Sequence, residues 1–347
     1  MALLEVEDLH THIFTRAGVN RAVNGVSFKL DAGQTLGLVG ESGSGKTMTA
    51  MSILRLIPKP AAQIVSGRIM FDGEDLNDKS ESEMRQVRGA EIAIILQDPL
   101  SSLNPVFNIK FQIGEAIALH QHLSGALLSG KVIESLGHVR VSAPEERMKN
   151  YPHQFSGGMR QRVVGAIAIS CEPRLLIADE PTTALDATIQ AQYLNLLRDL
   201  QQQFGLALLF ITHDFGIVAK MCDEVAVMYA GRIVEHASVR PIFDTPAHPY
   251  TLALLQAVPK MDSKVERLFA IEGVPATGHT EFKGCSFASR CPVALDKCHV
   301  EPPPLVLVAA DHFSECWRAE EVFAKGNDVE PTAHPGIQGS SSQPSGD

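Results

Sequence analysis

The chain has 347 residues, of which 45% are hydrophobic and 20% are charged. This composition is typical of a globular protein with one large or two smaller domains and a sizeable core. The formal net charge of −10 excludes a globally basic surface for nucleic acid, although a local basic patch is compatible with it.

Three further features narrow the class of protein. The longest uncharged apolar runs, such as residues 163–171, are shorter than the about 18 residues needed to cross a bilayer. The N-terminus has no basic region followed by an apolar block, so no export signal is expected. Six cysteines in this setting indicate a reducing cytosol rather than a disulfide framework.

The first predicted elements surround a glycine-rich loop. Residues 4–7 and 23–30 alternate like antiparallel strands with one exposed face. An apolar run over 34–39 predicts a strand, and residues 48–57 have helical spacing without glycine or proline. Between strand and helix lies the pattern G-x-x-x-x-G-K-[ST], which comprises Gly40, Glu41, Ser42, Gly43, Ser44, Gly45, Lys46 and Thr47.

This loop has the chemistry of a nucleotide phosphate site. Its glycines allow successive backbone N–H groups to point at phosphate oxygens, and the helix that follows adds its N-terminal N–H groups. We expect Lys46 to reach the β- and γ-phosphates of ATP and the Thr47 hydroxyl to bind Mg²⁺. The alternative, a chance glycine loop, is disfavoured by the flanking strand and helix.

The rest of the first two thirds alternates between strands and helices. Residues 97–151 are helical and punctuated by glycine, which predicts a helical subdomain inserted into an α/β core. The alternation on either side predicts a mostly parallel sheet covered by helices. The predicted strands are 66–71, 92–96, 175–178, 206–211 and 224–230; the predicted helices are 109–120, 131–138, 144–150, 159–170 and 188–204, with a last short helix at 252–258.

Polar residues follow three of the apolar strands. Asp179, after the strand at 175–178, is placed to hold Mg²⁺, and Glu180 to orient or deprotonate the attacking water. Gln97 is placed to touch Mg²⁺ or the water, and His213 to bind the γ-phosphate. Solvated strand ends, a surface glutamine and a structural histidine are the alternatives.

A second anion site precedes the helix at 159–170. Ser156 occupies a helix-cap position, and Gly157, Gly158 and Met159 follow it with accessible backbone N–H groups. The first loop already covers one face of a nucleotide. A second site in the same chain therefore indicates closure over a nucleotide held by another subunit.

From residue 3 to 235 the chain resembles the ATP-binding cassette (ABC) ATPases. Residues 40–47 match the Walker A loop, Gln97 the Q-loop and residues 155–159 the signature loop, in which Phe155 and Met159 depart from the usual LSGGQ. Residues 175–180 match Walker B with its catalytic glutamate, residues 184–186 the D-loop with Asp186, and His213 the switch histidine. The resemblance implies an α/β P-loop NTPase fold of ABC type: a mostly parallel sheet core, an antiparallel β subdomain and a helical subdomain at about 98–170.

It also implies an N-terminal aromatic residue that stacks on adenine; Phe14 is the candidate, and Ile13 and His12 compete with it.

The resemblance narrows to the dipeptide and oligopeptide importer ATPases, a branch that includes nickel importers. It is carried by residues 40–43, 97–105, 151–162 and 248–251. It implies two transmembrane permeases, an extracytoplasmic peptide-binding protein and a second ABC ATPase subunit, typically a non-identical paralogue. The implied location is peripheral, at the cytoplasmic face of the cell (inner) membrane, with no nucleic-acid partner.

Four cysteines lie within 32 residues near the C-terminus: Cys285, Cys291, Cys298 and Cys316. Four thiolates suffice for tetrahedral zinc or for an iron–sulfur cluster. The resemblance of residues 284–292 to the C-terminal extension of peptide-importer ATPases favours a 4Fe-4S cluster. Zinc is the alternative, with His299 and His312 as substitute ligands. The isolated Cys171 and Cys222 are expected to be packed apolar residues.

The sequence therefore predicts an ATPase domain at 1–235, an extension with the four-cysteine site at 236–324 and a disordered tail at 325–347. The predicted function is ATP hydrolysis that drives the import of di- or oligopeptides. An ABC ATPase that acts on nucleic acid or the ribosome, and a non-catalytic regulatory cassette, are the alternatives. The sequence leaves open which solute is carried.

Overall fold

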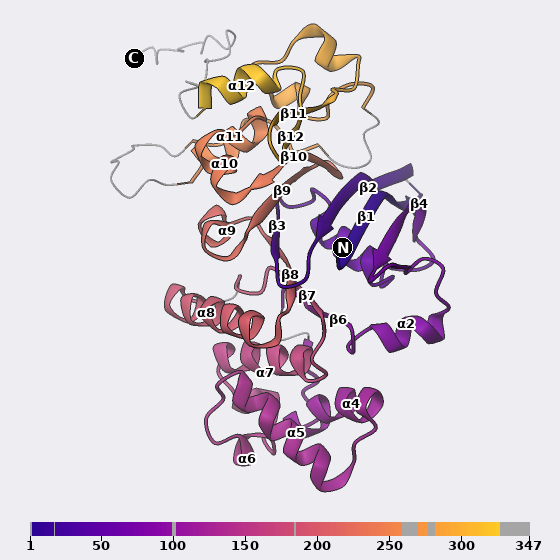
Figure 1. Ribbon diagram of the computed structural model, residues 1–347, viewed down its shortest axis with the longest axis vertical. Coiled ribbons are helices and arrows are strands. Elements are labelled where there is room, and N and C mark those ends of the chain that lie inside the picture. The colour runs from indigo at the N-terminus through magenta and orange to yellow at the C-terminus, as the bar shows by residue number, and fades with distance from the viewer. Residues whose placement is uncertain are drawn as a thin grey trace, which may run out of the picture.

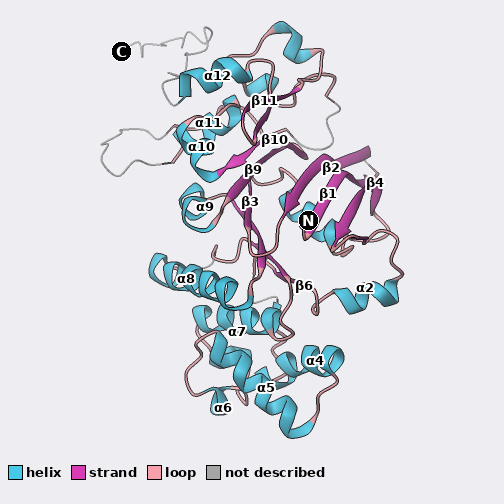
Figure 2. Cartoon of the chain, viewed as in Figure 1, coloured by secondary structure: helices cyan, strands magenta, loops and turns pink. Residues whose placement is uncertain are grey.

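The computed structural model describes residues 2–16, 18–98, 102–183, 185–258, 269–276 and 282–326 (Figure 1). The molecule is elongated, with a helical group at one end and the C-terminal elements at the other (Figure 1). The central strands run between these ends, and a separate small sheet lies to one side of them (Figure 2). None of the helices in these ranges has both the length and the apolar character needed to cross a lipid bilayer.

The main sheet has eight strands in the order β11-β12-β10-β9-β3-β8-β7-β6. The five from β9 to β6 pair in parallel, as the alternation of strands and helices predicts. Every residue of β3, β7 and β8 is buried, because elements cover both faces of the sheet. The bounds of the five strands are β3 Thr35–Val39, β6 Ile92–Ile95, β7 Leu175–Asp179, β8 Ala207–Thr212 and β9 Glu224–Tyr229.

The second sheet is antiparallel, in the order β2-β1-β4-β5. Its apolar side shares a core with β3 and with helix α1, Lys46–Ile53. β1, β2 and β4 are longer than predicted because they continue beyond the stretches with an apolar pattern, and β5 was not predicted. Their bounds are β1 Leu4–Thr15, β2 Gly18–Leu30, β4 Ala62–Phe71 and β5 Glu74–Asp75. Helix α2, Glu81–Val87, follows them; it was not predicted, although Ser80 and Glu83 form a capping box at its start.

A helical subdomain is inserted between β6 and β7, as predicted. It comprises α4 Ile109–Gln121, α5 Gly125–His138, α6 Pro144–Arg147 and the start of α7 Gly157–Ile169. Helix α7 joins this group to the sheet, since one core contains Ile113, Leu136, Val163 and Leu176. Two further helices follow, α8 Ala187–Phe204 and α9 Phe215–Met221, the second of them not predicted.

The C-terminal part extends the main sheet with three antiparallel strands. β10, Arg232–Ser238, pairs with both β9 and β12, so the predicted domain boundary at 235 lies inside a strand. Val39, Tyr229, Tyr250 and Phe287 belong to one core that joins this part to the ATPase sheet. The remaining elements are α10 Val239–Asp244, α11 Pro249–Gln256, β11 Leu305–Ala309, β12 His312–Glu315 and α12 Ala319–Lys325. The predicted disordered tail begins at 325, but Lys325 belongs to α12; from 327 onward the tail lies outside the described residues.

Candidate functional site

The glycine-rich loop joins β3 to α1 and packs closely against the backbone of neighbouring segments. Gly40 has φ of 152°, and a Cβ there would lie 2.2 Å from the Met228 carbonyl oxygen. Gly45 has φ of 108°, and a Cβ there would lie 2.3 Å from the carbonyl oxygen of Ala22. Only glycine fits these two positions, so the loop conformation depends on them.

Lys46 lies over this loop with its side chain almost fully buried. Its Nζ donates to the carbonyl oxygens of Gly40 at 2.8 Å and Glu41 at 2.9 Å, and lies 3.4 Å from Ser44 Oγ. Burial lowers the pKa of Lys46, whereas the nearby carboxylates of Glu180 and Asp179 oppose that shift. The arrangement sets a cation among oxygens, which suits a group that binds phosphate.

Thr47 and Asp179 place oxygen atoms that can bind a metal ion beside that lysine. The Thr47 hydroxyl, at the start of α1, interacts with the carboxylate of Asp179, at the end of β7. Burial raises the pKa of Asp179, and the bond from Thr47 counteracts the rise. A hydroxyl and a carboxylate are hard oxygen ligands, so the pair fits Mg²⁺.

Glu180 is held from three sides at the carboxyl ends of adjacent strands. Its carboxylate accepts hydrogen bonds from Gln97 Nε2 at 3.1 Å and from Thr183 Oγ1 at 3.0 Å, and lies 3.2 Å from His213 Nδ1. Its backbone has φ of 46° and its N–H donates to the Ile211 carbonyl at 2.9 Å. The structure therefore brings together Gln97, Glu180 and His213; Thr183 was not predicted.

The second predicted anion site lies at the start of α7. Ser156 caps this helix, accepting from the Met159 N–H at 3.4 Å, and both Ser156 and Gly157 are exposed. A Cβ at Gly158 would lie 2.7 Å from Ile189 Cγ2, so α7 packs closely against the start of α8. Asp186 caps α8 by accepting from the N–H groups of residues 188 and 189. Pro99 to Ser101 and Ala184, from the other predicted motifs, lie outside the described residues.

Phe14, the predicted adenine-stacking residue, lies near the end of β1 and is 44% exposed. It pairs with Val19 across the hairpin, and its ring centroid is 6.4 Å from that of His12. His12 and Ile13 are half-buried, so Phe14 is the most exposed of the three candidate side chains. Its role stays a prediction.

The predicted 4Fe-4S cluster is wrong. The four cysteines do line one small cavity, of about 20 Å³, but within the described ranges no three His, Cys, Asp or Glu side chains are arranged to hold a metal ion. Burial raises the pKa of Cys291 and of Cys316 to about 12, so without a metal ion both side chains are thiols. The zinc alternative has no support either, since His312 pairs with Glu235 at 2.7 Å. The prediction used the spacing of the four cysteines in the sequence, and that spacing gives no information on how their side chains are buried and arranged.

The sequence analysis did not predict a contact that joins the phosphate loop to the C-terminal part of the chain. Glu41 forms an ion pair with Arg290, and its N–H donates to Tyr250 Oη. Glu41 occupies one of the variable positions of the loop pattern, and its partners lie more than 200 residues away, so no sequence signal identified them.

These features define a P-loop nucleoside triphosphatase: a closely packed glycine loop, a lysine surrounded by the oxygens of that loop, and two acidic residues at the end of an adjacent strand. Residues 23–183 match the family described as ABC transporter, and residues 234–298 match the C-terminal region of oligopeptide/dipeptide transporters. The chain belongs to the ABC transporter ATP-binding proteins of the peptide-transport type.

Similar proteins support this assignment along nearly the whole chain. A probable peptide ABC transporter ATP-binding protein of Sinorhizobium fredii is 51% identical over 92% of this chain and 96% of its own. The dipeptide transport ATP-binding protein DppD of Bacillus subtilis is 45% identical over 94% of this chain and 98% of its own. Among solved structures, cbiO1 of Clostridium perfringens, part of the ABC transporter complex cbiONQ, has a TM-score of 0.60 at 27% identity, covering 70% of this chain and 90% of its own. The ATP-binding cassette MJ0796 in a dimeric state bound to ADP and Pi shares the fold, with a TM-score of 0.61 at 22% identity over 68% of this chain and 99% of its own.

Proposed function

We propose that this chain is the ATP-hydrolysing motor subunit of an importer for di- or oligopeptides. The observation that carries the proposal is the position of Glu180, held by Gln97 and His213 beside Lys46 and the Thr47–Asp179 pair. The peptide class is supported by relatives whose names give peptide, dipeptide or oligopeptide transport.

Each residue of the site then has a task in hydrolysis. The backbone N–H groups of residues 40–47 and the Lys46 ammonium bind the phosphates and stabilise the charge that develops on them. Thr47 and Asp179, with Gln97, would hold Mg²⁺, and the ion would supply positive charge that neutralises the phosphates. Glu180 takes a proton from the attacking water. His213 keeps that carboxylate oriented, with its Nδ1 3.2 Å from the Glu180 carboxylate.

A second ATPase subunit completes the site. The exposed Ser156 and Gly157 at the start of α7 would bind the γ-phosphate of ATP held by the partner, and the partner's equivalent loop would act on the ATP held here. Closure around two shared nucleotides, followed by reopening after hydrolysis, drives the permease because ATP binds the closed pair better. The partner is expected to be a paralogue.

An apolar patch follows the Q-loop and is available to a permease. Val106 is 73% exposed, and the rings of Phe107 and Phe111 stack at 4.3 Å on the surface of the helical subdomain. Contiguous exposed apolar groups are typical of protein interaction sites. The chain would therefore work at the cytoplasmic face of the cell membrane, with two permeases and an extracytoplasmic peptide-binding protein. Residues 1–235 would form the motor and residues 236–324 an accessory extension of its sheet.

An ATPase that acts on nucleic acid or the ribosome finds no support, because the relatives cited are named for peptide transport and the net charge is −10. A regulatory cassette is disfavoured by the complete set of Lys46, Asp179, Glu180 and His213.

The direct test is purification of the tagged full chain from its own membranes, with identification of the bound proteins. We expect two integral membrane proteins and a second ATPase subunit. The complex, reconstituted in vesicles, should take up labelled peptides when ATP and the binding protein are present. ATP hydrolysis without peptide uptake, or stimulation by nucleic acid instead, would contradict the proposal.

A further inference from the structure

Glu41, the second residue of the phosphate loop, connects that loop to the C-terminal part of the chain. Its carboxylate accepts from Arg290 Nη1 at 2.6 Å and Nη2 at 3.0 Å, and its N–H donates to Tyr250 Oη at 2.9 Å. Its carbonyl oxygen accepts from Lys46 Nζ at 2.9 Å. One peptide segment is therefore fixed by C-terminal side chains on one side and orients the phosphate-binding lysine on the other.

Arg290 is rigidly held for this contact. Its side chain is only 3% exposed, and it also donates from Nε to the Glu272 carbonyl at 3.0 Å and from Nη2 to the Ile271 carbonyl at 3.3 Å. The guanidinium lies 5.8 Å from the centre of the Tyr229 ring. A buried ion pair is costly unless its geometry is fixed and its other donors are satisfied, and both conditions hold here.

Tyr250 is equally fixed. It is fully buried on α11, and its ring centroid lies 4.7 Å from that of Tyr229 and 5.3 Å from that of Phe287. Burial raises the pKa of its phenol, so the hydroxyl is neutral and accepts the Glu41 N–H. Helix α11 itself is capped by His248, whose Nδ1 accepts from the Tyr250 N–H at 3.0 Å.

We propose that Arg290 and Tyr250 are positioning residues for the phosphate loop, which hold Glu41 so that Lys46 meets the phosphates in the productive geometry. The C-terminal part is thereby coupled to nucleotide affinity. Coupling of this kind is reciprocal, so bound MgATP in turn stabilises the docking of residues 269–276 and 282–326. The inference rests on the proposed nucleotide site.

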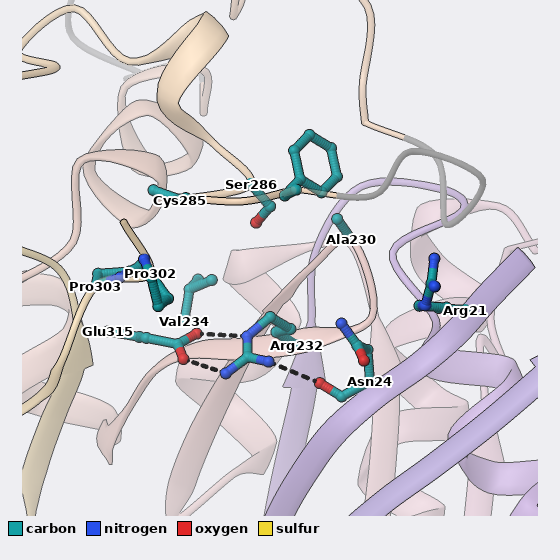
Figure 3. A pocket seen from close by; sticks show the side chains of 12 residues that line it. Arg21, Asn24, Ala230, Arg232, Val234, Cys285, Ser286, Pro302, Pro303 and Glu315 are labelled. Carbon is teal, nitrogen blue, oxygen red and sulfur yellow. Dashed lines mark hydrogen bonds and ion pairs between the residues drawn. The ribbon is translucent and has the colours of Figure 1, made fainter. Parts of the chain in front are cut away.

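A second ion pair of the same chemistry provides a matched control. Arg232 on β10 forms a bidentate pair with Glu315 on β12, with Nε donating to Oε2 at 2.9 Å, and its Nη1 donates to the Asn24 carbonyl at 3.1 Å. Figure 3 shows Arg232 between Glu315 and Asn24 in a pocket of about 270 Å³. Glu315 anchors the C-terminal hairpin to the sheet, and within the described residues its side-chain ion pair is with Arg232 rather than with the phosphate loop.

The experiment measures MgATP affinity of the purified full chain by calorimetry, together with thermal stability. Arg290→Met should weaken MgATP binding about three- to tenfold, within the range of couplings between linked sites. Arg290→Lys should recover part of that loss, because it keeps the charge without the second hydrogen bond. Tyr250→Phe should weaken binding too. Glu315→Gln should lower thermal stability but leave MgATP affinity unchanged.

The double variant Glu41→Gln with Arg290→Met separates positioning from stability. It leaves no buried unpaired charge, so its thermal stability should recover relative to Arg290→Met alone. Its MgATP affinity should stay as low as that of Arg290→Met, because the contact that positions Glu41 and Lys46 is still missing. In the assembled complex the KM for ATP should rise with little change in kcat.

Wild-type affinity in the folded Arg290→Met or double variant, with normal binding by the wild-type chain, would overturn this inference and leave the ATPase assignment intact. Recovery of affinity in parallel with stability would also overturn it. Failure of the wild-type chain itself to bind MgATP would instead contradict the proposed function.

Discussion

The imidazole of His213 lies 3.2 Å from the carboxylate of Glu180, measured from Nδ1 to Oε1. The two residues follow β8 and β7, which are adjacent parallel strands, so the sheet itself sets their separation. Gln97, after β6, donates to the other carboxylate oxygen at 3.1 Å. Three neighbouring strand ends therefore fix one carboxylate, which is the arrangement needed to aim a general base at a bound water.

His213→Ala should reduce ATP turnover by the assembled complex roughly a hundredfold, because Glu180 loses the side chain that orients it. MgATP affinity of the full chain should change little, since Lys46 and the loop are untouched. Steady-state hydrolysis and calorimetry measure the two effects. His299→Ala, an exposed histidine of the C-terminal part, is the control and should behave like the wild-type chain. Unchanged turnover in His213→Ala would remove this histidine from the mechanism.

Lys46→Met should weaken MgATP binding roughly ten- to a hundredfold, the range for loss of a hydrogen bond to a charged group. The methionine retains the buried stem, so the loop should still fold. Calorimetry on the full chain measures the affinity. Lys29→Met, an exposed lysine on β2, should bind MgATP normally. Equal affinity in Lys46→Met and the wild-type chain would show that the lysine does not contact phosphate.

Ser156→Glu should abolish most turnover by the assembled complex, because a carboxylate at the cap of α7 repels the γ-phosphate of the opposing subunit's ATP. The isolated full chain should still bind MgATP at its own phosphate loop. Ser124→Glu places the same charge at the exposed cap of α5 and should have no effect on turnover. If Ser156→Glu were fully active, the loop would not belong to a shared site.

His248 should make stability fall at mildly acidic pH. Burial lowers the pKa of His248 to about 3 from its usual 6.5, although a backbone hydrogen bond with Glu315 opposes the shift. The unfolded chain takes up a proton near pH 6.5 while the folded chain does not, so the stability present above pH 6.5 is lost as pH falls towards 3. Between pH 7 and pH 5 the loss is about 2 kcal/mol.

Urea denaturation of the wild-type chain and of His248→Asn at both pH values tests this. Asparagine keeps a helix-capping oxygen and does not titrate. The variant should therefore lack this part of the pH dependence, whatever its stability at pH 7. Equal pH dependence in the two proteins would show that His248 is not held neutral.

The sequence predicted the central strands and the phosphate loop because these features are local. The strands β3, β7 and β8 are continuous apolar runs, and the loop requires Gly40 and Gly45 at fixed spacing. The ABC-type core was implied by the resemblance of the ordered motifs to the ABC ATPases, and the inserted helices were predicted from their helical spacing. By contrast the hairpin of β11 and β12 was missed, because its strands are short and half-exposed and carry little pattern.

The parts of the site that sequence reasoning could not supply depend on contacts between distant segments. Glu41 and Arg290 are 249 positions apart, and nothing in either local pattern indicates the other. The cysteines illustrate the opposite error: Cys291 and Cys316 line one cavity, yet within the described residues no three His, Cys, Asp or Glu side chains are arranged to hold a metal ion. Proximity of ligand types does not by itself provide a metal site.

Glu180→Gln provides the most direct test of the ATPase assignment, measured as ATP hydrolysis and ATP retention by the assembled complex. Because the amide cannot accept the proton of water, we expect turnover to fall by roughly a hundredfold or more while ATP stays bound. Glu74→Gln, on the exposed edge of the small sheet, should hydrolyse ATP normally. Hydrolysis at the wild-type rate in Glu180→Gln would contradict the central claim that this carboxylate activates water beside the phosphate loop.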